Sequence, residues 1–462
     1  MLYRKVVFFM KNETDSSVVQ QPCGLSVGFG REEVMPDTVL PLGGNGLVGR
    51  EFTGINDILY ITCVAFADEA GNTVLMYTMD TLKSEMFIHP LRTAVSEATG
   101  IPGERILFSA THTHSAPAVY ADHLEGVGSY REIFRKAAIQ AAQVALEDLT
   151  PSQLHIGTAQ ATGMAFSRHY IYEDGHLGSV GKKTHGAIVG HADPADEQVQ
   201  LVTVSRQNKK DVLLMSVPVH GTSMSSEANK LISADVPGAI RAALEENTDY
   251  LVAYFIGAAG NQTPKSQAPD NHGLCVRDYG KKVAGYIADA LPNVKPVRTG
   301  PIQLLWHTYI ANSNKEKISL FEEACEVTEA YSRGGMREAK PYLRKYGMSS
   351  VWEAYAIQRR KNSGDTVELP LSALRMGDLS FVFAPYEMFA PNGQYIKEHT
   401  PGKMTFVVTC ANGAKGYLPM AHAYSYGVYE TYVTLVRKGT AEDVARYYIE
   451  MIEKMKKQEE IA

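Results

Sequence analysis

Apolar, strand-like runs alternate with helix-like stretches over residues 24–310, and this alternation constrains the fold more than any other feature. The runs Leu59–Asp68 and Thr73–Asp80 precede the helix-like stretch Ser84–Thr99, and the pattern continues as far as the run Tyr250–Ile256. Interleaved strands and helices are typical of layered α/β proteins. We therefore expect an α/β domain with a mixed sheet and helices on the outside.

One helix-like stretch, Tyr130–Leu149, has small residues on one face. Its alanines recur at helical spacing, at Ala137, Ala138, Ala141, Ala142 and Ala145. Small side chains let a helix backbone approach its neighbour closely. The spacing predicts that this face lies against a sheet.

The rest of the chain suggests one domain with an insertion. Residues 1–22 form a polar segment, and we expect a single catalytic domain over 23–462 without a C-terminal β-sandwich. The stretch 315–362 is charged and has a helical pattern. Because chemically informative residues lie on both sides of it, we expect it to be a helical insertion within one domain. Two long polar connections, Tyr170–Glu197 and Asn261–Leu274, are predicted as loops.

Charge and cysteine usage exclude several classes of protein. The 45 Lys and Arg residues against 51 Asp and Glu residues give a net charge of −6, so we expect no nucleic-acid partner. The five cysteines form no CxxC pair, and Cys63 and Cys410 lie in apolar runs, where we expect them buried. The apolar runs are too short for a membrane anchor or a signal peptide. We expect a cytoplasmic protein.

The most informative segment reads ILFSATHTHSAPAVY, where a buried strand leads into His112 and His114. In an extended chain, residues two apart point to the same side, so both imidazoles can enter one cleft. Imidazole is both a common metal ligand and a proton carrier. The alternative is a pair of surface histidines in a turn.

Two further residues repeat this pattern. His220 follows the Val-rich run in SVPVHGTSM, and Glu387 follows the strand-like run Leu379–Phe383. Ligands of α/β sheets bind at the carboxyl ends of strands, so these residues and His112 can share one rim. A structural histidine and a Glu–Arg ion pair are the alternatives. Asp80, at the end of another strand, could orient a ligand histidine or cap a helix.

Four ordered motifs now resemble one family. The segments THTHSAP, VHGTSMSSEANKLISADVPG, FIGAAGNQTP and CANGAKGYLPMAHAYSYGVYE are similar to conserved blocks of the neutral/alkaline non-lysosomal ceramidases. The resemblance extends over residues 24–440 and covers their N-terminal catalytic domain. It identifies the chain as a divergent, bacterial-type member.

The resemblance implies a zinc-dependent hydrolase that cleaves an amide (N-acyl) bond by attack of zinc-bound water. One zinc ion per chain would be held by His112, His220, Glu387 and Tyr417. His114 would carry the proton, and Arg168 and Tyr429 would contact the reacting amide or its oxyanion. Thr263 is a further candidate catalytic residue, because it stands where the family has a serine, in a segment that also has Asn261 in place of an aspartate.

The expected substrate is a small-molecule or lipid-like acyl amide. Two alternatives stay open at this point. The same site could open an ester or a lactone, because attack on any acyl carbon needs the same groups. The chain could also be a non-catalytic zinc-binding or ligand-binding descendant, for which Asn261 and Thr263 are the supporting features.

Overall fold

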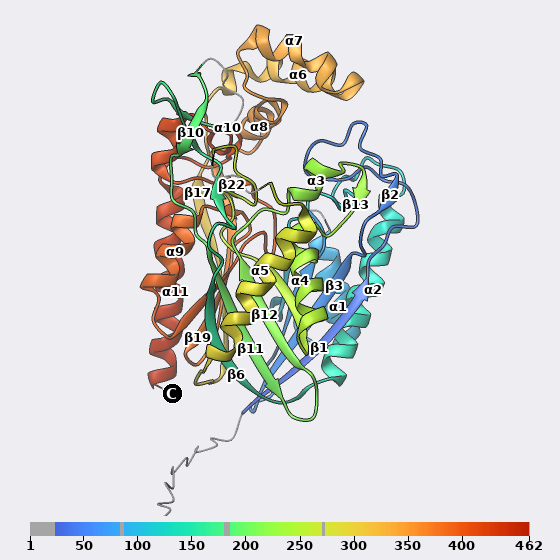
Figure 1. Cartoon of the computed structure of the whole chain (residues 1–462), viewed down its shortest axis with the longest axis vertical. Helices are drawn as coiled ribbons and strands as arrows, with labels where there is room; N and C mark the ends of the chain where they lie inside the picture. Colours follow the sequence, from blue (N-terminus) through green and yellow to red (C-terminus); the bar gives the residue numbers. More distant parts are fainter. Residues whose placement is uncertain (1–23, 84–86, 180–184, 270–272, 462) are drawn as a thin grey trace, which may run out of the picture.

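Four layers build the molecule: helices, a large sheet, a smaller sheet and further helices (Figure 1). The predicted α/β class with a mixed sheet is thereby confirmed. The polar segment predicted for residues 1–22 lies outside the described residues. The computed structural model describes residues 24–83, 87–179, 185–269 and 273–461.

The large sheet has nine strands and contains both parallel and antiparallel pairs. Its hydrogen-bonded order is β14 (Tyr250–Ile256), β12 (Asp211–Val217), β11 (Gln198–Arg206), β6 (Thr150–Gln160), β1 (Leu25–Glu33), β3 (Tyr60–Asp68), β4 (Thr73–Met79) and β5 (Ile106–Ala110), with β16 (Lys295–Pro296) paired to β6. Its outer face is covered by α1 (Ile88–Thr99), α2 (Val127–Glu147), α4 (Asp235–Asn247) and α5 (Val276–Ala290).

Helix α2 packs against β1 at unusually close range. A Cβ atom at Gly28 would lie 1.9 Å from the carbonyl oxygen of Ala145, and one at Gly30 would lie 2.1 Å from that of Ala141. The contact therefore requires glycine on the strand and small residues on the helix. The prediction that the alanine face lies against a sheet is confirmed.

The second sheet packs on the inner face of the first. It contains β17 (Ile302–Asn312), β18 (Thr366–Met376), β19 (Leu379–Phe383) and β21 (Met404–Val408), and α9 (Ala390–His399) and α11 (Thr440–Ile461) cover its other side. Fully buried apolar residues fill the space between the sheets, among them Val27, Phe66, Leu214, Phe381 and Phe406. Burying each such side chain stabilises the fold by roughly 1.5–3 kcal/mol.

The large sheet curls, so that its two terminal strands meet. Strands β14 and β5 end the hydrogen-bonded order, yet they contact each other, and Thr78 Oγ1 on β4 donates to the carbonyl oxygen of Tyr254 on β14 (2.5 Å). The residues that follow β21 join both edges, since Thr409 N donates to Ile256 O and Ala110 N to Cys410 O. The segments that leave β5, β12 and β21 thus emerge together.

Three further helices lie beyond this end of the sheets, where Figure 1 shows α6 and α7 at the top of the molecule. They fall within the stretch 315–362, for which an insertion was predicted, and are α6 (Phe321–Gly334), α7 (Met336–Tyr346) and α8 (Val351–Asn362). No helix in the described ranges is both long and apolar enough to cross a bilayer.

One predicted loop is corrected. The connection Tyr170–Glu197 contains a three-stranded sheet of β8 (Tyr170–Tyr172), β9 (Leu177–Gly178) and β10 (Ile188–His191). Strands of two to four residues are too short to show an alternating pattern, and tertiary pairing alone defines them. The other short elements are β2 (Gly54–Ile55), β7 (Phe166–Ser167), β13 (Leu231–Ile232), β15 (Gln262–Thr263), β20 (Glu387–Met388), β22 (Tyr417–Leu418), α3 (Ser223–Glu227), α10 (Tyr429–Val433) and the 3₁₀ turns Gly103–Arg105, Leu291–Asn293, Ile318–Leu320 and Ala421–Tyr426.

Candidate active site

The two histidine segments lie side by side at the curled end of the large sheet. Thr113 and Gly221 form a parallel bridge, and the amide of His114 donates to the carbonyl oxygen of Gly221 (2.9 Å). The ring centroids of His112 and His220 are 4.8 Å apart. Residues separated by more than one hundred positions are therefore fixed next to each other by backbone hydrogen bonds.

The backbone geometry at His112 differs from the prediction. Strand β5 ends at Ala110, and His112 has a left-handed φ of 63°, so the His112–His114 segment is not extended. The two rings nevertheless meet, with centroids 5.1 Å apart, and the amide of His112 donates to the carbonyl oxygen of Thr81 (3.0 Å). The proximity was predicted correctly, but the reason given for it was wrong.

Glu387 completes a buried centre with these histidines. Its Oε2 lies 3.0 Å from His220 Nε2 and 3.3 Å from His112 Nε2. The opposite ring nitrogens, Nδ1, contact backbone carbonyl oxygens, that of Leu82 for His112 (2.8 Å) and that of Ala259 for His220 (2.7 Å). A carbonyl oxygen only accepts, so each Nδ1 carries a proton and each Nε2 is directed towards the centre.

The donor set of this centre fits a metal ion. Candidate ligand atoms of His112, His114 and His220 all lie within 4.8 Å of one another. His112 Nε2 and both ring nitrogens of His114 are buried, and none of them has a hydrogen-bond partner within the described part of the chain. Backbone carbonyls that fix the far nitrogen of an imidazole are a usual second layer around metal ligands. Imidazole nitrogen and carboxylate oxygen are ligands that zinc prefers.

Burial and neighbouring charges set the protonation of the centre. Burial opposes ionisation of Glu387, but His112 and His220 outweigh it and hold the pKa of this carboxyl well below its usual range. Burial and the positive charge of Arg168 lower the pKa of His220 to about 4. Burial, with His112 and His220 adjacent, also lowers the pKa of His114 well below its usual value. His114 is therefore neutral at pH 7, with a lone pair on one of its ring nitrogens.

Tyr417, Arg168 and Tyr429 line the side of Glu387. Strands β20 and β22 pair in parallel, with Glu387 opposite Tyr417. The guanidinium carbon of Arg168 lies 5.3 Å from the centroid of the Tyr417 ring, and the rings of Tyr417 and Tyr429 are 5.7 Å apart. Arg168 is held by Glu430 Oε1 (2.6 Å) and by the carbonyl oxygen of Gly260 (2.7 Å). The structure thus brings these predicted residues together.

Thr263 and Asp80 are placed differently. The Thr263 hydroxyl lies against the backbone of Lys265, 3.2 Å from its carbonyl oxygen, so its catalytic role stays a prediction. Asp80 binds Arg241 on α4 (2.7 Å) and accepts from the amide of Tyr60 (2.9 Å). The expectation that Asp80 orients a ligand histidine or caps a helix is wrong, because a buried ion pair occupies it.

Sequence reasoning missed the groups that support the centre. The carbonyl oxygens that orient His112 and His220 carry no residue-type signal. Gly44 contacts His114, since a Cβ atom at Gly44 would lie 2.3 Å from His114 Nδ1. The run Gly43–Gly46 (GGNG) was the signal that could have pointed to this close approach.

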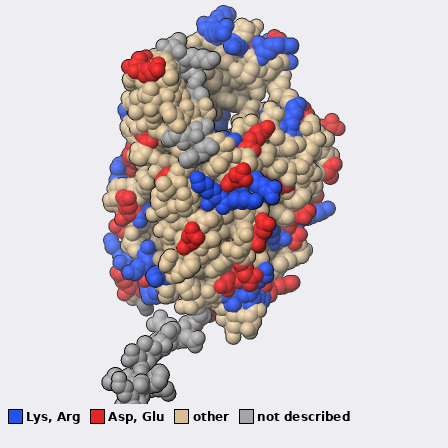
Figure 2. All heavy atoms as spheres, in the orientation of Figure 1, with Lys and Arg blue, Asp and Glu red and all other residues tan. Residues whose placement is uncertain are grey.

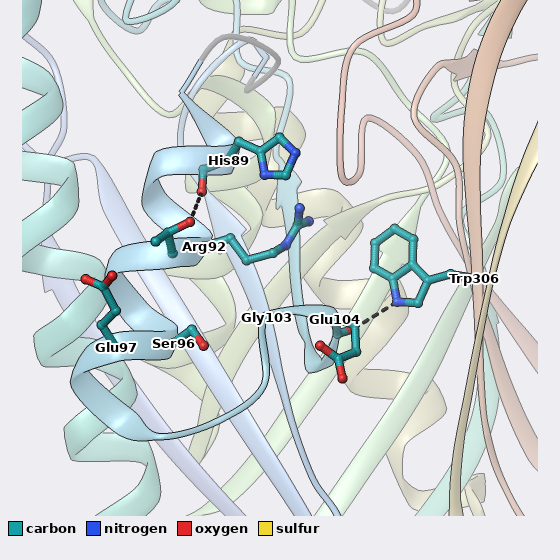
Figure 3. Close-up of a pocket in the computed structure, with 8 residues that line it drawn as sticks. His89, Arg92, Ser96, Glu97, Gly103, Glu104 and Trp306 are labelled. Carbon is teal, nitrogen blue, oxygen red and sulfur yellow. Dashed lines mark hydrogen bonds between the residues drawn. The ribbon is translucent and has the colours of Figure 1, made fainter.

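A separate surface pocket of about 420 Å³ lies along α1. Figure 3 shows the Arg92 side chain extending towards Trp306, and its guanidinium carbon lies 5.5 Å from the centroid of the Trp306 ring. Gly103 and Glu104, which line this pocket, precede β5, whereas His112 follows that strand. The pocket is therefore distinct from the histidine centre.

Fold and site define a layered α/β protein with a buried histidine–carboxylate centre at its strand ends. The fold is that of neutral ceramidase. A crystal structure of neutral ceramidase from Pseudomonas aeruginosa is similar with a TM-score of 0.71 and 17% identity, over 95% of this chain and 75% of the other. A structure described as a ceramidase complexed with C2 is similar with a TM-score of 0.71 and 16% identity, over 94% and 76%. The predicted resemblance is confirmed at the level of the fold.

No protein-family model and no curated protein matches the chain. At 16–17% identity, structural similarity shows the fold alone, and the chemistry has to be argued from the site.

Proposed function

We propose that this chain is a zinc-dependent hydrolase that cleaves the amide bond of an N-acyl substrate. The observation that carries this proposal is the convergence of His112 Nε2, His220 Nε2 and a Glu387 oxygen at one buried point, with each far nitrogen fixed by a carbonyl oxygen. The ceramidase fold supports the amide as the bond that is cleaved.

His112, His220, Glu387 and Tyr417 are the proposed ligands. When bound, zinc lowers the pKa of a water molecule and polarises an acyl carbonyl. Glu387 supplies the negative charge that offsets the cation, and its low pKa keeps it ionised at neutral pH. The pairing of Tyr417 with Glu387 across the β20–β22 pair supports Tyr417 as the fourth ligand.

The remaining groups move a proton and bind developing charge. His114 is neutral, and its unpaired ring nitrogens can take a proton from the attacking water and give it to the departing amine. Arg168 is cationic, and burial raises the pKa of Tyr429, so this phenol stays protonated. Both are donors suited to an oxyanion, and a preorganised donor of this kind is worth about 10²–10³ in kcat.

The proposed substrate is a lipid-like or small acyl amide, in keeping with the ceramidase fold. An ester or lactone on the same site is the second candidate, favoured by the fact that none of the groups above is specific for nitrogen as the leaving atom.

Metal analysis combined with a substrate panel tests the proposal. We expect one zinc per chain and hydrolysis of N-acyl amides that a chelator abolishes and added zinc restores. Zinc without chelator-sensitive turnover of any amide or ester would favour a binding protein, and turnover of esters alone would favour the second candidate.

Two variants separate ligand from proton carrier. Glu387→Ala should lose both zinc and activity, whereas His114→Gln should keep zinc and lose roughly 10²–10⁴ of kcat. Loss of zinc in His114→Gln would instead assign a three-histidine centre, as the spacing within 4.8 Å also permits. His89→Gln, on the exposed surface of α1, is the control.

A further inference from the structure

A row of alternating charges leads away from the candidate active site. Arg168 binds Glu430 Oε1 (2.6 Å), and the other oxygen of Glu430 lies 3.2 Å from His169 Nε2. His169 Nδ1 lies 2.8 Å from Asp193 Oδ2, and the second oxygen of Asp193 lies 3.1 Å from His422 Nε2. The row therefore joins segments that are widely separated in the sequence.

His169 is the central member of this row and is completely buried. Each of its ring nitrogens faces a carboxylate oxygen, which can only accept a hydrogen bond when ionised. A neutral imidazole has one N–H and would direct a lone pair at one of the two carboxylates. The contacts are satisfied only when both nitrogens are protonated, so that the row reads plus, minus, plus, minus from Arg168 to Asp193.

The neighbouring charges agree with this assignment. Burial alone would lower the pKa of His169, but Glu430 and Asp193 outweigh it and raise this pKa to about 9. Burial likewise opposes the ionisation of Glu430, but Arg168 and His169 lower the pKa of this carboxyl to about 2. An unpaired charge at these buried positions would be costly, so each member depends on the next.

We propose that His169, doubly protonated at neutral pH, is a positioning residue, which fixes Glu430 and, through it, the guanidinium of Arg168 over Tyr417. Glu430 has a single orientation in which one oxygen binds Arg168 and the other binds His169. Packing of the His169 ring against Phe389, 5.4 Å away and directly after β20, fixes the imidazole itself. The part of this inference that concerns turnover rests on the proposed amide hydrolysis.

The test begins with the charge, independently of activity. In zinc-loaded protein labelled with ¹⁵N-histidine, both ring nitrogens of His169 should be protonated at pH 7. In ¹⁵N-arginine protein, the Nε–H of Arg168 should exchange slowly with water, and at least tenfold faster in His169→Gln. An unprotonated ring nitrogen, or unchanged exchange in the variant, would overturn the proposal.

Activity and rescue supply the second arm. His169→Gln should lower kcat for a short acyl amide at least tenfold and change KM less than twofold, because Arg168 acts on the developing charge. In the double variant His169→Gln/Asp193→Asn, the amide at position 169 can donate to Glu430 and accept a hydrogen bond from the amide at position 193. Most of kcat should therefore return. Failure of rescue with kcat low in both would overturn the positioning role.

The two proposals fail separately. If the wild type hydrolyses no amide, the proposed function fails, and the protonation of His169 and the exchange of Arg168 still decide whether the row positions the guanidinium. His89→Gln serves as the matched control, since the same substitution on the exposed face of α1 leaves the row intact.

Discussion

Gly44 shows how closely single residues define the site. Its φ is +99°, and a Cβ atom there would lie 2.3 Å from His114 Nδ1. The loop has no freedom to withdraw, because Gly43 N donates to Ala116 O and Arg50 binds the carbonyl oxygen of Gly43 (2.6 Å). The added methyl group must therefore displace the imidazole.

Gly44→Ala should lower kcat at least tenfold and leave the zinc content unchanged if His114 carries the proton and is not a ligand. Gly49→Ala is the matched control, since Gly49 also has a positive φ, of +72°, but nothing within 4 Å of the added atom. Both variants bear a backbone strain of about 1–2 kcal/mol. Equal kcat values in the two variants would exclude the contact with His114 as the cause.

The raised pKa of His169 makes the folded protein less stable as the pH rises. Its pKa in the folded protein is about 9, above the ordinary value of 6.5. The groups facing it are the carboxylates of Glu430 and Asp193 and the Tyr426 ring. Because the folded pKa is raised, the stabilisation is fully present below pH 6.5 and is lost as the pH rises through 9.

Chemical denaturation between pH 6.5 and pH 10 measures this loss of stability. The free energy of unfolding of the wild type should fall by on the order of 3 kcal/mol between pH 6.5 and pH 10, relative to the double variant His169→Gln/Asp193→Asn. Parallel pH profiles of the two proteins would mean that His169 is neutral in the folded state.

At the scale of elements, regular strands and helices were predictable and close approaches were not. The run predicted at Tyr250–Ile256 coincides with β14, and its apolar character suffices to identify it. Strand β1 was missed because Gly28 and Gly30 interrupt its pattern, and their purpose is visible only once α2 lies over them. Periodicity records which face is buried, not how near the neighbouring backbone comes.

The site was predictable to a similar extent. His112 and His220 follow apolar strands and could be assigned to one rim from that pattern. Tyr417 comes opposite Glu387 through a pairing of two residues on each side, which no periodicity reveals, and only the family resemblance pointed to it. The row through His169 depends on tertiary contacts between distant segments, so residue types alone could not show it.

Helix α8 is tied to α10, the element that carries Tyr429 and Glu430. Arg360 on α8 is 1% exposed and donates to the carbonyl oxygens of Tyr432 (2.6 Å) and Thr434 (2.8 and 2.9 Å). Arginine reaches these acceptors with a planar fork that lysine lacks.

Arg360→Lys should therefore leave buried carbonyls without donors and lower the free energy of unfolding by about 3 kcal/mol in urea titrations. It should also lower kcat, because α10 loses its anchor. Arg359→Lys is the control, at the exposed neighbouring position on the same helix. Equal stability of the two variants would show that α10 is held by other contacts.

Across the whole molecule, the proposed zinc site links the two sheets. His112 and His220 follow β5 and β12 of the large sheet, and Glu387 follows β19 of the smaller one. Charges of both signs are interspersed over the face shown in Figure 2, so the described residues of that face create no field of a single sign. A cation held from both layers binds the folded chain and not the unfolded one.

Zinc should therefore raise the melting temperature, by roughly 3 °C at a free concentration one hundred times its Kd, since that ratio adds about 2.7 kcal/mol to a chain of this length. Differential scanning calorimetry with and without chelator measures the shift. Glu387→Gln, which removes the ligand from the smaller sheet, should abolish most of it, and His114→Gln should retain it. A shift that survives in Glu387→Gln would mean that the ion is held by the large sheet alone, through the three histidines.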